Sequence, residues 1–230
     1  MTKICFISDT HYSKYIDNTY LKIAKDTDIL IHCGDFSMRA SQMDLDIFIA
    51  QFAKLPGKEK IFIAGNHDII CERLGKEAVK QQALEKGVLY LEDDSYISST
   101  GLNIYGSPYS PLFGRDWAYQ LLPGQMTIDK WKQIPYNIDL LVTHGPPYGI
   151  GDEVCNYSTN YKVNNVGCHI LTSEIFKRDS IRVHAAGHIH EMSGIRQEHN
   201  KAFVNASMLD DNYKLKYPPR YITLDERKPE

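Results

Sequence analysis

Short apolar runs alternate with polar stretches along most of the chain, and the runs are rich in β-branched residues. Runs of this length are typical of strands, and near-continuous apolar runs indicate strands that are covered on both faces. The pattern predicts strands at residues 3–8, 28–33, 60–64, 102–106, 139–144, 181–186, 202–207 and 220–224.

Helical spacing of apolar positions occupies three of the segments between these runs. Residues 41–55 begin with Ser41 and carry Asp44 three positions later, which is a variant of the capping box. Residues 77–87 and 167–179 have the same periodicity. Because strands and helices alternate in the first half and strands dominate afterwards, the sequence indicates a mixed α/β sandwich.

Two long stretches fit neither the strand pattern nor the helical spacing. Residues 106–124 are rich in glycine, proline and aromatic residues, and residues 145–167 are rich in glycine, asparagine and tyrosine. Loops of this length in a compact domain are usually functional or mobile. The 230-residue chain shows no clear linker or internal repeat, so we predict a single domain over residues 1–230.

Composition narrows the class of protein. An apolar share of 43% and a charged share of 24% are typical of a globular protein, and a net charge of −3 argues against a general nucleic-acid binder. The 5 cysteines are scattered without a CxxC pair, which indicates neither a disulfide framework nor a zinc ribbon. The sequence contains no signal-peptide pattern and no membrane-spanning run, so we expect a cytoplasmic protein without a membrane partner.

Polar side chains with metal-binding chemistry follow five of the predicted strands. In chain order the segments are Ser8-Asp9-Thr10-His11, Gly34-Asp35, Gly65-Asn66-His67-Asp68, Thr143-His144-Gly145 and Gly187-His188-Ile189-His190. Ligand sites of α/β sheets form at the carboxyl ends of strands, so side chains far apart in sequence can converge there. Carboxylate, imidazole and amide oxygen are ligands of borderline divalent metals.

Each segment alone is a weak signal. A lone D-x-H is more often a surface turn or a cap, and a Gly-Asn pair is most often a turn. In an extended segment residues i and i+2 point the same way, which would pair Asp9 with His11 and His188 with His190. A bridging carboxylate can hold two cations about 3.5–4 Å apart, an arrangement suited to in-line displacement at phosphorus. Five such segments at strand ends therefore favour a metal site.

The motifs SDTH, GDF, GNHD, THGPP and GHIHE resemble, in this order, those of the calcineurin-like metallophosphoesterase superfamily. They extend from residue 8 to about residue 191. The additional GSPYSP and VNAS look most like the metallophosphoesterase-domain-containing branch of that superfamily. The resemblance implies a four-layer αββα sandwich of two mixed sheets that holds two divalent metal ions.

The same resemblance implies a role for each position. One metal would be held by Asp9, His11 and His190, the other by Asn66, His144 and His188, and Asp35 would bridge them. His67 matches the general acid that protonates the leaving oxygen. We expect Asp68 to accept the other N–H of His67 and fix its tautomer, with a helix cap as the alternative.

Several residues keep two interpretations. Arg39 lies four positions after Asp35, where related protein Ser/Thr phosphatases hold the substrate phosphate, yet the acidic residue before that arginine is missing here. Arg39 could also be a solvated residue at a helix start.

We expect His32 and His184 to be satisfied core groups, while Asn205 either orients a ligand loop or makes structural hydrogen bonds. The aromatic residues of the 106–124 stretch have two interpretations: they stack a nucleobase or cover the site, or they form a hydrophobic plug of the sandwich. These residues are Tyr109, Phe113, Trp117 and Tyr119.

The resulting prediction is a dinuclear metal-dependent phosphoesterase, in which a metal-bridging hydroxide attacks phosphorus and His67 acts as the acid. A phosphodiesterase acting on a nucleotide-like or other small diester is favoured. The alternatives are a phosphomonoesterase or protein phosphatase and, least favoured, a non-catalytic scaffold. Manganese is the expected metal, and iron, zinc, cobalt or nickel would fit the same ligands. The sequence does not indicate an oligomeric state.

Overall fold

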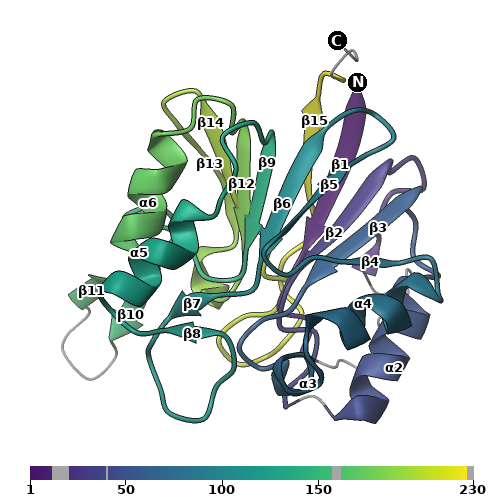
Figure 1. Ribbon diagram of the computed structural model, residues 1–230, viewed down its shortest axis with the longest axis horizontal. Helices are drawn as coiled ribbons and strands as arrows, with labels where there is room; N and C mark the ends of the chain where they lie inside the picture. The colour runs from purple at the N-terminus through teal and green to yellow at the C-terminus, as the bar shows by residue number, and fades with distance from the viewer. Residues whose placement is uncertain (12–20, 40, 157–161, 227–230) are drawn as a thin grey trace.

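Two mixed sheets pack face to face in the computed structural model, which describes residues 1–11, 21–39, 41–156 and 162–226 (Figure 1). The first sheet has the order β15-β1-β2-β3-β4, with bounds Arg220–Leu224, Thr2–Ile7, Ile29–Cys33, Glu59–Ile63 and Leu89–Tyr90. The second has the order β13-β14-β12-β9-β6-β5, with bounds Gly194–Glu198, Lys201–Asn205, Val183–Ala186, Leu140–Thr143, Asn103–Ser107 and Asp94–Ile97.

Parallel pairing aligns the carboxyl ends of the central strands. In the first sheet β1, β2, β3 and β4 run parallel, and in the second β6, β9, β12 and β14 do so. A parallel bridge between Ser8 and Ser207 joins the end of β1 to the end of β14. The strand ends of both sheets therefore meet at one edge of the sandwich, which lies at the bottom of Figure 1.

Helices cover the outer face of each sheet (Figure 1). The first sheet carries α2 (Gln42–Phe52), α3 (Ile69–Leu74) and α4 (Lys76–Leu84). The second carries α5 (Gln125–Lys132) and α6 (His169–Phe176). The capping box at the start of α2 is confirmed. The Ser41 side chain accepts a hydrogen bond from the backbone N–H of Asp44, and the Asp44 side chain accepts one from the backbone N–H of Ser41.

The apolar side chains of β1 show why its sequence is apolar throughout. Ile4 and Phe6 are buried between the two sheets, whereas Cys5 and Ile7 are buried under the helices of the first sheet. A third apolar cluster, which includes Trp131 of α5, lies under the helices of the second sheet. These layers confirm the αββα sandwich.

All predicted strands and helices are present, with ends that differ by a few residues. The expectation that residues 106–124 and 145–167 lack regular elements was wrong. The first stretch contains the short pair β7 (Ser110–Pro111) and β8 (Gln120–Leu121), and the second contains the hairpin β10 (Glu153–Asn156) and β11 (Lys162–Asn165). No helix in the described parts of the chain has both the length and the apolarity that crossing a membrane requires.

Candidate metal centre

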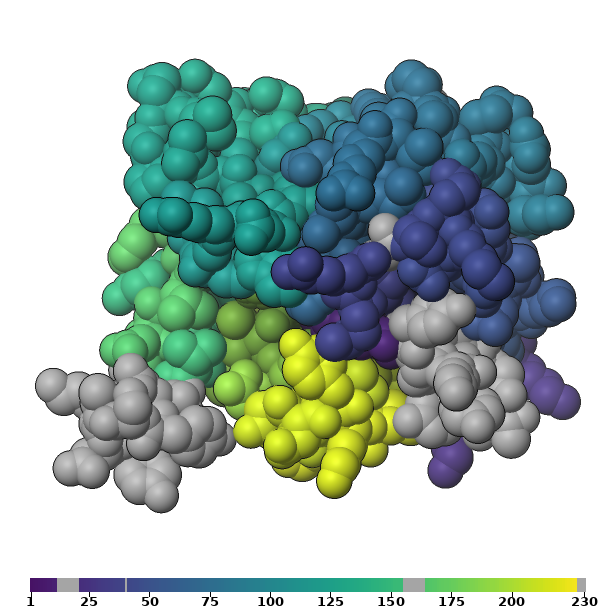
Figure 2. All heavy atoms as spheres, turned by 90° about the horizontal axis from the view of Figure 1, so that it is seen from below, coloured from purple at the N-terminus to yellow at the C-terminus, as the bar shows by residue number. Residues whose placement is uncertain are grey.

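The five polar segments meet at the edge where the strands of both sheets end. The Nε2 atoms of His11 and His190 lie 3.2 Å apart, although the two residues are 179 positions apart in sequence. Seen from that edge, the purple N-terminal segment is visible only at the bottom of a small hollow (Figure 2). Dark-blue and yellow segments border this hollow, so three distant parts of the chain surround the site.

Side-chain donors form two adjoining groups of expected ligands, Asp9, His11, His190 and Asp35, His144, His188, and in each group one donor atom per residue lies within 4.8 Å of the others. A third group of three equally close residues, His11, Asp35 and His67, overlaps both. Asn66 joins the second group through its Oδ1, which lies 3.0 Å from His144 Nε2. The groups adjoin because His11 Nε2 is 3.8 Å from Asp35 Oδ2. The seven expected ligands are thus brought together, and their binding of metal stays a prediction.

Four of these residues have an unusual backbone conformation. The φ angles of Asp9, His11, Asp35 and His188 are 51°, 42°, 56° and 69°. This left-handed region is sterically unfavourable for residues with a Cβ, and such strain tends to cluster at functional sites. The turn at His188, followed by the 3-10 helix η1 (His190–Met192), sends His188 and His190 to different groups. The extended pairing expected for these two histidines was therefore wrong.

Two glycines of the motifs allow the close approach of backbone to ligand. A Cβ on Gly65 would lie 2.2 Å from Asp35 Oδ1, and a Cβ on Gly187 would lie 2.2 Å from Asp9 Oδ2. Both distances are far below van der Waals contact. Any larger residue at these positions would displace a carboxylate of the site.

Buried charge makes the site suitable for cations. Burial raises the pKa of Asp9, but the hydrogen bond and charge of His190 hold it well below its usual value. Burial lowers the pKa of His144, yet Asp35 raises it to about 9, and Asp9 does the same for His190. The two carboxylates therefore create a strongly negative potential inside the protein. Divalent cations would balance it and leave the imidazoles neutral, so the residues fit a dinuclear centre.

Backbone carbonyls orient three of the ligand histidines. Nδ1 of His11, His144 and His190 donates to the carbonyls of Ser37, Cys33 and Asp210, at 3.1, 2.9 and 2.9 Å respectively. With the Nδ1 proton held by a carbonyl, each Nε2 is directed at the centre and would give its lone pair to a cation in place of a proton.

Asn205 and Ser207 support the Asp9 side of the centre. Asn205 Nδ2 donates to the Ile189 carbonyl at 2.8 Å, so this residue orients the loop that carries His188 and His190. Ser207 Oγ donates to Asp9 Oδ2 at 2.8 Å, a contact that the sequence analysis missed.

Asp68 does not contact His67 in the expected way, and that expectation was wrong. His67 Nδ1 instead donates to the Met38 carbonyl at 2.6 Å. The Asp68 carboxylate is fully buried and points at the loop after β2. It accepts hydrogen bonds from the N–H groups of Gly65, Asp35, Phe36 and Ser37 and from the Ser37 hydroxyl. Asp68 occupies the N-cap position of α3, but its side chain makes no capping bond to the described first turn.

His67 lies beside the two groups of donors. Its Nε2 is 3.9 Å from Asp35 Oδ2, and its ring centre is 4.6 Å from that of His11. The ring of Trp117 packs against His67 with 4.3 Å between centres. Arg39 is exposed, and its guanidinium carbon lies 5.3 Å from the Trp117 ring centre. Arg39 is therefore at the rim of the site, and a contact with substrate stays a prediction.

The aromatic residues of the 106–124 stretch divide into two kinds. Phe113 is 52% exposed and lies 4.9 Å from the ring of His188, so it borders the centre together with Trp117. Tyr119 is buried, and its hydroxyl lies 3.1 Å from that of Tyr90. Tyr109 packs against Tyr119. Tyr109 and Tyr119 thus fill the interior, while Phe113 and Trp117 line the site.

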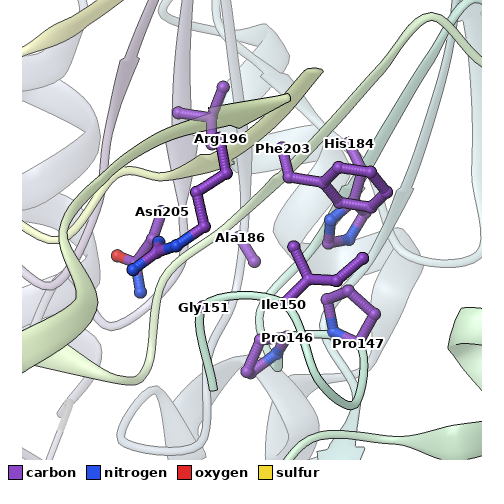
Figure 3. A pocket seen from close by; sticks show the side chains of 10 residues that line it. Pro146, Pro147, Ile150, Gly151, His184, Ala186, Arg196, Phe203 and Asn205 are labelled. Atoms are coloured by element: carbon purple, nitrogen blue, oxygen red, sulfur yellow. The ribbon is translucent and has the colours of Figure 1, made fainter. Parts of the chain in front are cut away.

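His32 and His184 are satisfied core groups, as expected. His32 Nε2 lies 3.0 Å from Thr10 Oγ1, and His184 Nε2 lies 2.8 Å from Thr143 Oγ1. Burial lowers the pKa of both imidazoles to about 3, so they are neutral. A cavity next to His184, bordered by Arg196 and Asn205, has a volume of about 10 Å³ (Figure 3). It is too small for a phosphoester.

Tyr213 is an aromatic neighbour of the centre that the sequence analysis missed. Its ring centre lies 4.9 Å from that of His11 and 5.3 Å from that of His190. No sequence motif marks Tyr213, and its position depends on the conformation of the segment after β14.

Comparisons with known proteins agree with this geometry. A family model for calcineurin-like phosphoesterases matches residues 2–192. The human metallophosphoesterase domain-containing protein 1 is 33% identical over 97% of this chain and 71% of its own length. A UPF0046 protein of Caenorhabditis elegans is 34% identical, over 93% of this chain and 77% of its own.

Solved structures share the fold at low sequence identity. A Thermus thermophilus protein has a TM-score of 0.63 and 15% identity, with 94% of this chain and 97% of that chain covered. A dimetal phosphatase of Danio rerio has a TM-score of 0.53 and 10% identity, with 89% and 86% covered.

Proposed function

Since this chain belongs to the calcineurin-like phosphoesterase family and is a metal-dependent phosphoester hydrolase, we propose that it cleaves small phosphodiesters at a dinuclear metal centre. The observation that carries the proposal is the convergence of two donor groups on Asp35, the residue proposed to bridge them. Retention of every expected ligand and of His67 argues against a non-catalytic scaffold.

The proposed metal ligands are divided as their positions suggest. One cation would be held by Asp9, His11 and His190, the other by Asn66, His144 and His188, with Asp35 between them. When bound, the two cations supply Lewis-acid polarisation of the phosphoryl group and a water of lowered pKa. Manganese is the metal that we propose.

Buried free thiols at Cys5, Cys33, Cys71 and Cys168 support a reducing, cytoplasmic setting.

His67 is the proposed general acid. Its Nδ1 donates to the Met38 carbonyl, which fixes the ring and directs Nε2 toward the centre. Imidazole is the side chain that most often transfers protons in catalysis. From this position His67 would give a proton to the leaving oxygen, and Trp117 would keep the ring in place by packing on its face.

The rim of the site supports a diester with a flat leaving group, such as a nucleotide. Phe113 and Trp117 offer exposed or partly exposed aromatic faces beside His188 and His67. A planar group could stack on these faces, which contributes about 1–3 kcal/mol per base in nucleic-acid complexes. Arg39 would pair with the charge of the substrate at the same rim.

Activity of the metal-stripped protein resupplied with Mn²⁺ tests this proposal. We expect hydrolysis of linear or cyclic nucleotide diesters to exceed that of phosphomonoesters. His67→Ala should lower kcat by about 10²–10⁴-fold, the usual contribution of a general acid, and Asp35→Asn should abolish metal-dependent turnover. His199→Ala is the matched control, because His199 is exposed and packs on Phe176 away from the site.

Two results would contradict parts of the proposal. If folded His67→Ala and Asp35→Asn proteins hydrolyse every ester as fast as the wild type, the dinuclear mechanism is wrong. If monoesters are the better substrates, the enzyme is a phosphomonoesterase and the preference for diesters is wrong.

A further inference from the structure

The segment between β14 and β15 folds across the carboxyl ends of the strands. The N–H of Met208 donates to the Ser8 carbonyl at 3.1 Å, which attaches the segment to the end of β1. The Asp210 carbonyl accepts from the Tyr213 N–H and from His190 Nδ1, both at 2.9 Å. One carbonyl therefore positions both a proposed metal ligand and Tyr213.

Tyr213 has a backbone conformation that tyrosine rarely adopts. Its φ angle is 57°, in the left-handed region where glycine and asparagine are the usual residues. The side chain is 46% exposed, so burial in the core does not account for a bulky residue at this position. Strain of this kind persists where the side chain has a function that the surrounding structure supports.

The ring of Tyr213 lies at the mouth of the centre. It meets His11 and His190 edge-on, with 4.9 and 5.3 Å between ring centres. The ring of His11 also contacts His67, the proposed general acid, at 4.6 Å. In Figure 2 the yellow segment that carries Tyr213 borders the hollow in which the purple segment is visible. A phosphoryl group bound beside His11 and His190 would therefore lie close to this side chain.

We propose that Tyr213 is a catalytic residue that donates a hydrogen bond from its hydroxyl to a non-bridging oxygen of the substrate phosphoryl group. The inference rests on the proposed phosphoester hydrolysis. A phenol has an ordinary pKa of about 10, so it is a neutral donor at physiological pH. Negative charge spread over the phosphoryl oxygens in the transition state would be stabilised by such a donor. The phenol keeps its proton, and the bonds that break and form are those of the hydrolysis.

A neutral donor suits this position for an electrostatic reason. Asp9 and Asp35 are buried nearby and negatively charged, so a third anionic group would repel the substrate further. The Tyr213 hydroxyl adds a donor without adding charge. The competing interpretation is that only the aromatic ring matters, as a wall of the site.

Tyr213→Phe separates these interpretations because it removes the hydroxyl and keeps the ring. The test compares kcat and KM of the Mn²⁺-loaded proteins for bis(p-nitrophenyl) phosphate, and the Kd of inorganic phosphate by calorimetry. We expect kcat/KM to fall about 10- to 100-fold, and phosphate binding to weaken by about tenfold or more, as for one lost hydrogen bond to a charged group. Tyr217→Phe is the matched control, since Tyr217 belongs to the same segment and lines a groove with Leu21 and Pro218.

Tyr213→Asn tests the strained conformation. Asparagine tolerates a positive φ, so the melting temperature should not fall, while phosphate binding and turnover should. A fall in melting temperature with unchanged phosphate binding would assign Tyr213 a structural role and overturn the proposal.

Further outcomes discriminate between the two levels of inference. If the wild type hydrolyses the diester and Tyr213→Phe equals it in both turnover and phosphate affinity, the role of the hydroxyl is wrong and the proposed function stands. If the wild type hydrolyses no ester, both are wrong.

Discussion

The Asp68 carboxylate joins two ligand loops. Its hydrogen bonds come from Gly65, which follows β3, and from the residues Asp35 to Ser37, which follow β2. Both loops carry proposed ligands, Asn66 on one and Asp35 on the other. Asp68 therefore acts on the site through the backbone, and the placement of Asp35 depends on it.

Replacing Asp68 with asparagine should weaken both folding and metal binding. The amide N–H₂ of the variant would face backbone donors, which leaves buried groups unpaired at a cost of about 2–3 kcal/mol. Metal affinity should fall about 10- to 100-fold, as for other groups that orient ligands. Urea unfolding and metal titration would measure the two effects.

Asp46→Asn serves as the control for Asp68→Asn, because Asp46 is exposed and bonds only Gln42 among the contacts described. Its stability should stay within about 0.5 kcal/mol of the wild type. If Asp68→Asn kept full stability and metal affinity and changed only the pH profile of turnover, Asp68 would be a partner of His67 after all.

At the scale of elements, a buried ion pair at the end of α6 contacts the segment that follows α5. Arg178 Nη1 lies 2.6 Å from Glu174 Oε2, and the side chains are 1% and 5% exposed. Arg178 also donates to the carbonyl of Ile134, which follows α5. Burial raises the pKa of Glu174, but its hydrogen bonds to Arg178 and Lys177 hold it below the usual value. The pair therefore links the two helices of this layer.

The contribution of Glu174 to stability should depend on pH. Because its pKa is lowered by folding, the stabilisation is present above the unfolded pKa of about 4.3 and is lost as the pH falls through the folded pKa. Glu174→Gln should lower the free energy of unfolding by about 2 kcal/mol at pH 7, and the difference from the wild type should shrink below about pH 4. Urea unfolding over that range measures it. Lys177→Met alters an exposed partner of Glu174 and should have little effect on the free energy of unfolding. An equal loss of stability in both variants would contradict the role of the buried pair with Arg178.

The limits of sequence prediction also differ between elements. The strand expected at 60–64 corresponds to β3, whose burial on both faces produces its apolar run. Edge strands β5 and β13 were missed because their residues are half-buried or exposed, which removes the apolar signal. The convergence of the ligands could be predicted, since ligand sites of α/β sheets form at the carboxyl ends of the strands. The contacts of Asp68 and Tyr213 could not, because they depend on loop conformations that no period in the sequence specifies.

At the scale of the whole molecule, the candidate centre joins the two sheets. Asp9, Asp35 and Asn66 follow strands of the first sheet, whereas His144 and His188 follow strands of the second. Cations bound between these residues would connect the two halves of the sandwich. Any such ligand that binds only the folded state stabilises it.

We therefore expect Mn²⁺ to raise the melting temperature of the metal-stripped protein, by an amount equivalent to about 2.7 kcal/mol at a concentration of 100 times the Kd. At one fixed Mn²⁺ concentration, the rise in melting temperature should be smaller at pH 6 than at pH 8. The pKa of His144 and of His190 is about 9 without metal, so protons compete with cations for their imidazoles. Thermal unfolding with and without Mn²⁺ at the two pH values measures both effects. Asp35→Asn should lose the shift, because it removes the charge shared by both groups of donors, and His199→Ala should keep it. An undiminished shift in Asp35→Asn would mean that the cation binds elsewhere and that the two sheets are not joined through this centre.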